Sequence, residues 1–264
     1  MTAGPDRRAA RRRGAALLAV TEPVRTLAGA GALAASFPLL RTAPRGVPHP
    51  VLVLPGLLTS DLSTKTLRSW VNRLGHPVAG WALGRNRGPS KEINDELPAL
   101  VARLAAEHGA PVSVIGWSLG GVFARRLARR APRQVRQVIS LGTPLSLPGR
   151  RPGAGAGGRV YRRFVPLQVV DGSSASTDAL PRPLPVPSTA VYSRWDGVVD
   201  WRACRQQPGP ISENVAVRSS HLGMTHDPAV LWIVADRLAL PPDAWRPFER
   251  PTRFGLGALF PSDD

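Results

Sequence analysis

Residues 112–121, VSVIGWSLGG, contain the strongest indication of fold and chemistry in this chain. Gly116, Ser118 and Gly120 fit the pattern G-x-S-x-G, in which a sharp turn between a strand and a helix exposes a serine hydroxyl. The pentapeptide alone is weak evidence, but an apolar run precedes it at 111–115 and a helical pattern follows it at 122–130. The stretch therefore predicts a strand, a tight turn at the serine and a helix.

Short apolar runs alternate with helical patterns on both sides of this stretch. The expected strands are 51–54, 77–82, 111–115, 135–141, 189–193 and 214–217, and the expected helices are 63–74, 93–108, 119–130 and 228–239. Strands that alternate with helices form parallel sheets covered on both faces. The sequence therefore predicts an α/β fold with a mostly parallel sheet of about six strands.

Composition divides the chain into three regions. We expect a basic and apolar helical segment at 1–47, the α/β domain at 48–240 and a C-terminal tail at 241–264. Within the domain, 144–187 has no strong periodicity, and it contains GAGAGG and a proline-rich stretch. A segment of this length without a periodic pattern is typical of a functional insertion or a disordered loop, so we expect a small mobile cap there.

The overall composition is that of a globular protein with a basic balance. The chain has 264 residues, 43% of them hydrophobic, and a length of this order buries roughly 70–75% of the unfolded surface. The lone Cys204 excludes an intramolecular disulfide and a cysteine-based zinc site. The formal charge is +17, but the basic residues are scattered arginines without a recognition motif or interleaved aromatic residues, so no nucleic-acid partner is expected.

The first forty residues resemble a targeting segment only in part. Residues 6–13 contain five arginines and precede an apolar run, an order typical of signal peptides, but Glu22, Pro23 and Arg25 interrupt that run. We therefore favour a cytoplasmic or peripheral-membrane location and keep export as the alternative. The uncharged stretch 26–40 is shorter than the ~20 residues that cross a bilayer, and it predicts a helix that lies on the domain or on a membrane surface.

A serine hydroxyl becomes a nucleophile when a base takes its proton and a third group orients that base. The turn at Ser118 predicts the order serine, acid, histidine, with the acid and the histidine each at the end of a later strand. Asp196 follows the expected strand 189–193, and His221 follows the expected strand 214–217. These three residues are therefore the candidate catalytic triad.

Two neighbouring residues compete for these roles. Asp200 remains a second candidate for the acid, and a helix cap or a salt bridge is its alternative role. His226 is expected to be a loop or helix-start residue. His221, His226 and Asp227 lack a further ligand at a useful spacing, so the sequence does not predict a metal site.

The charge that develops on a carbonyl oxygen during acyl transfer needs hydrogen-bond donors. Leu119 directly follows the serine at the start of a helix, where its N–H can donate. The second donor is expected in the loop after the first strand, where Gly56 permits a tight turn and the Leu57 N–H points at the site. An ordinary Pro-Gly turn is the alternative for this loop.

Five motifs together resemble a known superfamily. They are VLVLPGLL at 51–58, GWSLGG at 116–121, LGTP at 141–144, YSRWDGVVDW at 192–201 and SHLGM at 220–224. The chain resembles the α/β-hydrolase superfamily from about Pro48 to Leu238, specifically bacterial esterase/lipase-like proteins related to triacylglycerol lipases and the GPI inositol-deacylase type. The resemblance implies a Ser118, Asp196, His221 triad and an oxyanion N–H from Leu57. Residues 1–49 lack the family's two initial antiparallel strands, which indicates a trimmed fold with an N-terminal helix in their place.

Other residues near these motifs have less specific interpretations. Asn86 is expected to shape a loop near the site rather than to contact substrate. Trp117, Trp195 and Trp201 either line an apolar pocket or pack in the core. The arginines of the helix after Ser118 are expected to form a solvated face; they are Arg125, Arg126, Arg129 and Arg130.

These observations predict a monomeric serine hydrolase that acts on a small-molecule ester or lipid without a cofactor or metal. An acyltransferase that uses the same acyl-enzyme is one alternative. A catalytically inactive hydrolase scaffold that binds a ligand or a membrane is another. Peripheral contact with a membrane is compatible with each of them.

Overall fold

The computed structural model describes residues 5–146, 180–252, 257 and 260–261. Six strands form one parallel sheet in the order β2-β1-β3-β4-β5-β6. The strands are β1 (Val51–Leu54), β2 (Val78–Gly80), β3 (Val112–Trp117), β4 (Val135–Leu141), β5 (Ser188–Ser193) and β6 (Ser212–Val217). The predicted parallel sheet is confirmed, and each expected strand overlaps an observed one.

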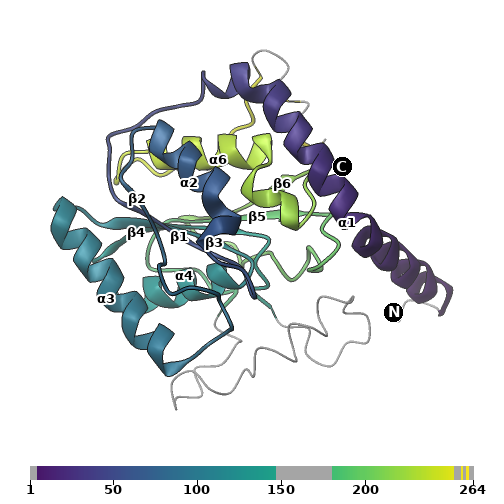
Figure 1. Cartoon of the computed structure of the whole chain (residues 1–264), viewed down its shortest axis with the longest axis horizontal. Helices are drawn as coiled ribbons and strands as arrows, with labels where there is room; N and C mark the ends of the chain where they lie inside the picture. Colours follow the sequence, from purple (N-terminus) through teal and green to yellow (C-terminus); the bar gives the residue numbers. More distant parts are fainter. Residues whose placement is uncertain (1–4, 147–179, 253–256, 258–259, 262–264) are drawn as a thin grey trace.

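Helices cover both faces of the sheet, as predicted (Figure 1). One face is covered by α2 (Lys65–Arg73), which follows the short helix η1 (Asp61–Thr64), and by α6 (Pro228–Ala239). The other face is covered by α3 (Lys91–His108) and α4 (Leu119–Arg130). Each face therefore has its own hydrophobic core, and the sheet separates the two.

Local signals explain where these helices begin and end. The Ser90 side chain accepts a hydrogen bond from the Ile93 N–H at the start of α3, and Gly109 ends that helix with a φ of 60°. Asp227 accepts hydrogen bonds from the first free N–H groups of α6, and proline occupies the first helical position after it.

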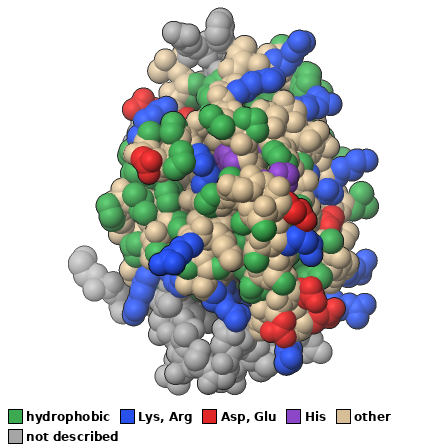
Figure 2. All heavy atoms as spheres, turned by 90° about the vertical axis from the view of Figure 1, so that its left-hand side faces the viewer, with side chains coloured by type: hydrophobic (Ala, Val, Ile, Leu, Met, Phe, Trp, Pro, Cys, Tyr) green, Lys and Arg blue, Asp and Glu red, His purple; other side chains and the backbone are tan. Residues whose placement is uncertain are grey.

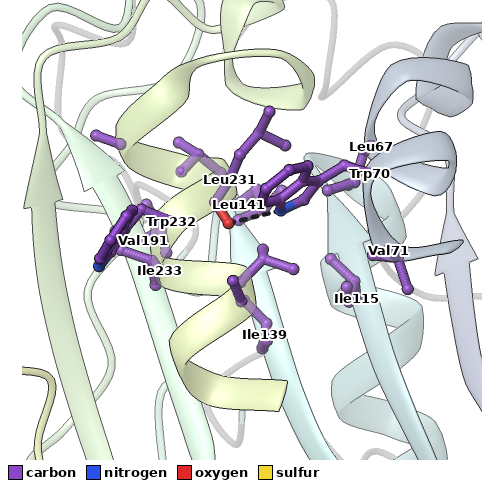
Figure 3. Close-up of a cluster of buried hydrophobic side chains, with 14 of the residues drawn as sticks. Leu67, Trp70, Val71, Ile115, Ile139, Leu141, Val191, Leu231, Trp232 and Ile233 are labelled. Atoms are coloured by element: carbon purple, nitrogen blue, oxygen red, sulfur yellow. Dashed lines mark hydrogen bonds between the residues drawn. The ribbon is translucent and has the colours of Figure 1, made fainter. Parts of the chain in front are cut away.

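The core on the α2 and α6 face contains a buried tryptophan, Trp70 (Figure 3). Its indole Nε1–H donates a hydrogen bond of 2.9 Å to the Leu231 carbonyl in α6. Around it pack Leu141 and Ile139 from β4 and Ile115 from β3. Burial of these side chains joins α2, α6 and the central strands into one unit.

The N-terminal segment is one long helix, α1 (Pro5–Leu40), which contains Pro23 and Pro38. The helix is longer than the expected helix at 26–40 and lies within the expected helical segment 1–47. It packs against α6 and the short helix η3 (Leu222–Thr225). Figure 1 shows its first turns extending beyond the edge of the sheet. No described helix is both long and apolar enough to span a membrane.

Arg125 contradicts the expected solvated face of α4. Its side chain is fully buried, and its guanidinium donates hydrogen bonds to the carbonyls of Leu180 and Arg182 and to Gln206 Oε1. Burial, with a smaller contribution from Arg129, lowers the pKa of Arg125 to about 9. The periodicity of α4 showed where arginines lie on the helix but not that a distant segment covers one of them.

Other basic side chains are dispersed, as the sequence suggests. Figure 2 shows Lys and Arg scattered over the face it presents rather than gathered into one patch.

The expected cap at 144–187 falls mainly on 147–179, which lie outside the described residues. The described end of that interval packs in the core beside α4 through Leu180, Leu184 and Val186.

Candidate active site

Ser118 lies in a sharp turn between β3 and α4, at the carboxyl edge of the sheet. Its φ of 52° and ψ of −120° are strained for a residue other than glycine, a cost of order 1–3 kcal/mol. A Cβ on Gly116 would lie 2.4 Å from the Gly121 backbone, and a Cβ on Gly120 would lie 2.3 Å from the Leu54 carbonyl oxygen. The glycines of the motif are therefore required, because strand and helix approach too closely for side chains.

His221 and Asp196 meet Ser118 at this edge. The His221 Nε2 lies 3.0 Å from Ser118 Oγ, and the His221 Nδ1 lies 2.6 Å from Asp196 Oδ2. Asp196 follows β5 and His221 follows β6, the positions expected from the sequence. The other carboxylate oxygen, Oδ1, accepts hydrogen bonds from the N–H groups of Val198 and Val199, so the carboxylate is held at both oxygens.

The competing residues lie elsewhere. Asp200 Oδ1 accepts a 3.0 Å hydrogen bond from the Arg202 N–H and forms a 3.4 Å ion pair with the same arginine. The His226 Nε2 lies 3.2 Å from the Thr26 carbonyl oxygen. The alternative roles named for them, a salt bridge for Asp200 and a loop position for His226, match these contacts.

The charges around His221 favour its protonated form. Burial alone disfavours the imidazolium, but the adjacent Asp196 carboxylate, its hydrogen bond and the more distant charge of Glu22 outweigh burial, so the pKa of His221 is raised. The imidazole is therefore held where a positive charge is stabilised, which is the requirement for a base that receives a proton.

The three tryptophans have different environments. Trp117 is buried, and its Nε1–H donates a 3.0 Å hydrogen bond to the His221 carbonyl. Trp195 is 52% exposed beside the Asp196 loop. Trp201 stacks on Tyr192 with ring centroids 5.7 Å apart. Trp117 therefore packs in the core, whereas Trp195 offers an apolar surface next to the site.

The loop after β1 lies close to Ser118. A Cβ added to Gly56 would lie 3.3 Å from the Ser118 Cβ, so glycine allows the Leu57 backbone to approach the serine. The loop is tied to Asn86, which is fully buried and bonds to the Pro55 carbonyl through its side chain and to Leu58 and Thr59 through its backbone. These bonds match the expectation that Asn86 shapes this loop.

The two expected oxyanion donors are available for a ligand. Leu119 is the first residue of α4, where helix N–H groups have no intrahelical acceptor. Within the described part of the chain, neither the Leu57 N–H nor the Leu119 N–H has a hydrogen-bond acceptor. The neighbouring strands β2 and β3 lie on opposite sides of β1, and ligands bind at such switch points at the carboxyl edge of parallel sheets.

Gly142 is a site residue to which the sequence analysis assigned no role. It follows β4 with a φ of 55°, and a Cβ there would lie 3.2 Å from His221 Nδ1 and 3.3 Å from Asp196 Oδ2. The motif LGTP contained this glycine, but only the fold shows that it lies against the hydrogen bond between the histidine and the acid.

A second serine–histidine contact lies at the other end of β3. The His49 Nε2 is 2.8 Å from Ser113 Oγ, and the Gln137 side chain also donates to that oxygen. The His49 Nδ1 faces the Val47 carbonyl, and no carboxylate bonds to this pair within the described residues. Burial, opposed only by the bond to Val47, lowers the pKa of His49 to about 4. This pair is fully buried and is structural.

Comparison with known proteins supports the fold assignment. No protein-family model and no curated protein matches the sequence. Among solved structures, Aspergillus fumigatus lipase B is 17% identical with a TM-score of 0.52, and the match covers 84% of this chain and 62% of the lipase. A pyrethroid hydrolase from Sphingobium faniae is 16% identical with a TM-score of 0.52, over 74% of this chain and 99% of that one.

The thioesterase domain from the curacin biosynthetic pathway is similar to the same extent. It is 15% identical with a TM-score of 0.50, and the match covers 74% of this chain and 93% of that domain. Identities this low show the fold alone. The chain has the α/β-hydrolase fold, and α1 precedes β1 in the described residues.

Proposed function

We propose that this protein is a serine hydrolase that cleaves carboxylic esters with an apolar acyl chain. The observation that carries the proposal is the continuous chain of contacts from Ser118 Oγ to His221 and on to Asp196, at the carboxyl edge of the sheet. Each of the three residues comes from a different loop. Their assembly therefore depends on the whole fold rather than on one local motif.

The contacts assign the tautomer of the histidine. The Asp196 carboxylate can only accept, so His221 Nδ1 carries the proton and Nε2 is left to accept the proton of Ser118. Ser118 Oγ attacks the ester carbonyl carbon while His221 takes the hydroxyl proton. The imidazolium then gives that proton to the departing alcohol, and the acyl group remains on the serine.

Water completes the cycle by the same route. His221 takes a proton from water, the resulting hydroxyl attacks the acyl carbon, and Ser118 leaves with the proton returned by the histidine. In both halves the Leu57 and Leu119 N–H groups donate to the oxygen that becomes negative. The helix start at Leu119 favours that negative charge.

Exposed apolar side chains around the site support an apolar acyl group. Trp195 directly precedes Asp196 and is 52% exposed, and Leu222 directly follows His221 and is 41% exposed. Leu58, in the loop after β1, is also exposed. Such groups bury well against a hydrocarbon chain and poorly against a charged substrate.

The test is hydrolysis of p-nitrophenyl esters from C2 to C16, with Ser118→Ala as the control. We expect hydrolysis by the wild type only, and labelling of the wild type but not of Ser118→Ala by a fluorophosphonate. Labelling without hydrolysis, together with acyl transfer to an added alcohol, would favour the acyltransferase. A folded protein that is neither labelled by the fluorophosphonate nor able to hydrolyse the esters would be an inactive hydrolase scaffold.

We also propose that α1 contacts an anionic membrane surface. Four apolar residues at helical spacing are 66–78% exposed on it: Leu17, Val20, Val24 and Leu27. Five arginines precede them in the sequence, within 6–13. An apolar helix face with adjacent basic residues suits the boundary between headgroups and acyl chains.

Sedimentation with lipid vesicles tests this location. We expect the protein to bind phosphatidylglycerol vesicles and not phosphatidylcholine vesicles, and we expect glutamine at the four apolar positions to abolish binding. Wild-type protein that binds neither kind of vesicle contradicts the proposal. A dimer in solution that the glutamine variant dissociates would instead assign the four residues to pairing between two copies of the chain.

A further inference from the structure

The loops that carry the acid and the histidine are joined through a single side chain of α1, Glu22. Its side chain is 5% exposed. Glu22 Oε2 accepts a 3.2 Å hydrogen bond from the Gly197 N–H, and Glu22 Oε1 accepts a 2.8 Å hydrogen bond from the Leu222 N–H. Gly197 directly follows Asp196, and Leu222 directly follows His221. One carboxylate therefore holds the backbone beside both residues.

α1 also contacts the residue directly before the acid and the residue directly before the histidine. The Arg25 guanidinium lies 2.8 Å from Glu22 Oε2 and donates to the Trp195 carbonyl. The Thr26 hydroxyl lies 3.0 Å from the Ser220 hydroxyl. The helix therefore contacts the residues directly before and after Asp196 and the residues directly before and after His221.

The approach of α1 at Gly197 is closer than any side chain allows. A Cβ there would lie 2.4 Å from the Leu18 carbonyl oxygen and 2.8 Å from Glu22 Oε2. The glycine after the acid therefore fits α1 as well as its own loop. This contact is independent of the hydrogen bonds and places the same helix against the same loop.

A buried carboxylate is costly unless it is paired and hydrogen-bonded. Glu22 satisfies both conditions, with one cation and two backbone N–H groups. An apolar side chain could pack α1 against the loops, but it could not accept the two N–H groups or place a negative charge near the histidine. Those two properties distinguish a functional carboxylate from a packing residue.

We propose that Glu22 is a positioning residue: it fixes the loops of Asp196 and His221 relative to each other, and its charge stabilises the imidazolium that forms during ester hydrolysis. The inference rests on the proposed function. It makes α1 part of the working site although the helix supplies no reacting atom.

Several charged and titratable groups lie near His221, and the test must separate their effects on its pKa from the effect of Glu22. They are Asp196 on the loop after β5, Glu22 and Arg25 on α1, His226 after η3, and Cys204 near the acid. Burial and then the charge of Asp196 raise the pKa of the Cys204 thiol, so it stays neutral. Asp196 and Glu22 both favour the imidazolium.

The experiment compares Glu22→Gln with the wild type in the full chain, with p-nitrophenyl butyrate as substrate. The glutamine keeps one acceptor oxygen but turns an NH₂ group toward a backbone N–H, and it removes the charge. We expect kcat to fall 10- to 100-fold with KM changed less than threefold, since misplacement of about 1 Å can cost 10²-fold. We also expect the acid limb of kcat/KM to move to lower pH, because the negative charge of Glu22 raises the pKa of His221.

Two further variants separate charge from shape. Thr26→Val is the matched control, because it loses an α1 contact with the histidine loop but no charge, and its acid limb should not move. Glu22→Asp keeps the charge and loses reach, so kcat should fall while the acid limb stays near the wild-type position. If Glu22→Gln does not fold, Glu22→Asp is decisive, and an unchanged kcat overturns the proposal.

Titration of the His221 imidazole by NMR gives a readout that needs no turnover. We expect its midpoint to be lower in Glu22→Gln than in the wild type. An unchanged midpoint together with an unchanged kcat overturns the role of Glu22. A wild type without ester hydrolysis overturns the proposed function instead, and the titration still decides whether Glu22 acts on the histidine.

Discussion

β3 and the turn that follows it carry a serine–histidine contact at each end. The two contacts differ in the third partner, which is the group that contacts the other ring nitrogen of the histidine. At the carboxyl end, His221 lies between Ser118 and the carboxylate of Asp196. At the amino end, His49 lies between Ser113 and a neutral backbone carbonyl. The two serines are five residues apart, ~16 Å along an extended chain.

The third partner sets the direction in which each histidine titrates. Burial disfavours the charged form of both rings. At His221 the carboxylate outweighs burial and raises the pKa. At His49 the Val47 carbonyl does not outweigh burial, the charges of Arg136 and His76 lower the pKa further, and it falls to about 4. A serine next to a histidine is therefore insufficient for catalysis, because the histidine must also be able to hold a proton.

The largest effect is expected from the serines themselves. Ser118→Ala should lower the turnover number by roughly 10⁶, whereas Ser113→Ala should leave it near the wild-type value. Ser113→Ala should instead lower the free energy of unfolding by about 1–2 kcal/mol, because His49 and Gln137 lose a buried partner. Ester hydrolysis and urea unfolding of both variants measure these effects, and an inactive, folded Ser113→Ala would contradict the comparison.

The third partner is tested by replacing the acids. Asp196→Asn should lower the turnover number by ~10⁴, since the amide no longer enforces the histidine tautomer. Asp200→Asn removes an equally charged side chain four residues away whose carboxylate bonds to Arg202 rather than to His221, and it should lose less than about tenfold. If Asp200→Asn were the inactive variant and Asp196→Asn retained activity, the acid assignment would move to Asp200.

The tight packing at the carboxyl end is tested at Gly142. A methyl group there would lie 2.8 Å from Met224 Sδ and within 3.3 Å of both atoms of the hydrogen bond between His221 and Asp196, so Gly142→Ala should lower kcat by about 10²-fold. Gly109→Ala is the matched control, because Gly109 has a φ of 60° but nothing within 4 Å of the added Cβ. Both variants should lose stability through backbone strain, and only Gly142→Ala should lose activity. Equal activity in the two would refute the steric role.

The smallest expected effect is on the free energy of unfolding at acid pH, and it depends on His49 at the amino end of β3. The unfolded chain protonates His49 near pH 6.5 and the folded chain only near pH 4, so stability falls as the pH drops between these values. Urea unfolding should show a loss of ~2 kcal/mol from pH 7.5 to 4.5 through this group. The raised pKa of His221 acts oppositely: its contribution is present below pH 6.5 and is lost as the pH rises through the folded value.

Replacement of His49 isolates that contribution. His49→Gln should flatten the dependence of the unfolding free energy on acid pH, although His76, whose pKa burial also lowers, retains part of it. A slope identical to that of the wild type would show that His49 does not limit acid stability.

The parts of the fold that could be predicted depend on local sequence. The bounds of α4, α6, β1 and β4 were predicted without error, because apolar periodicity and turn residues act within a few positions. The order of Ser118, Asp196 and His221 was likewise readable, because each follows a recognisable strand. Residues 241–264 and the expected cap gave no such periodic pattern.

The sequence by itself thus determined the parallel sheet, the turn at Ser118 and the candidates for base and acid. Only the tertiary structure decided that His221 faces Asp196 rather than Asp200, that Glu22 reaches both loops and that Arg125 is buried. The physical reason is the range of the interactions. Periodicity and capping act between near neighbours, whereas these hydrogen bonds and close contacts join residues that lie far apart in the chain and meet only once the sheet has formed.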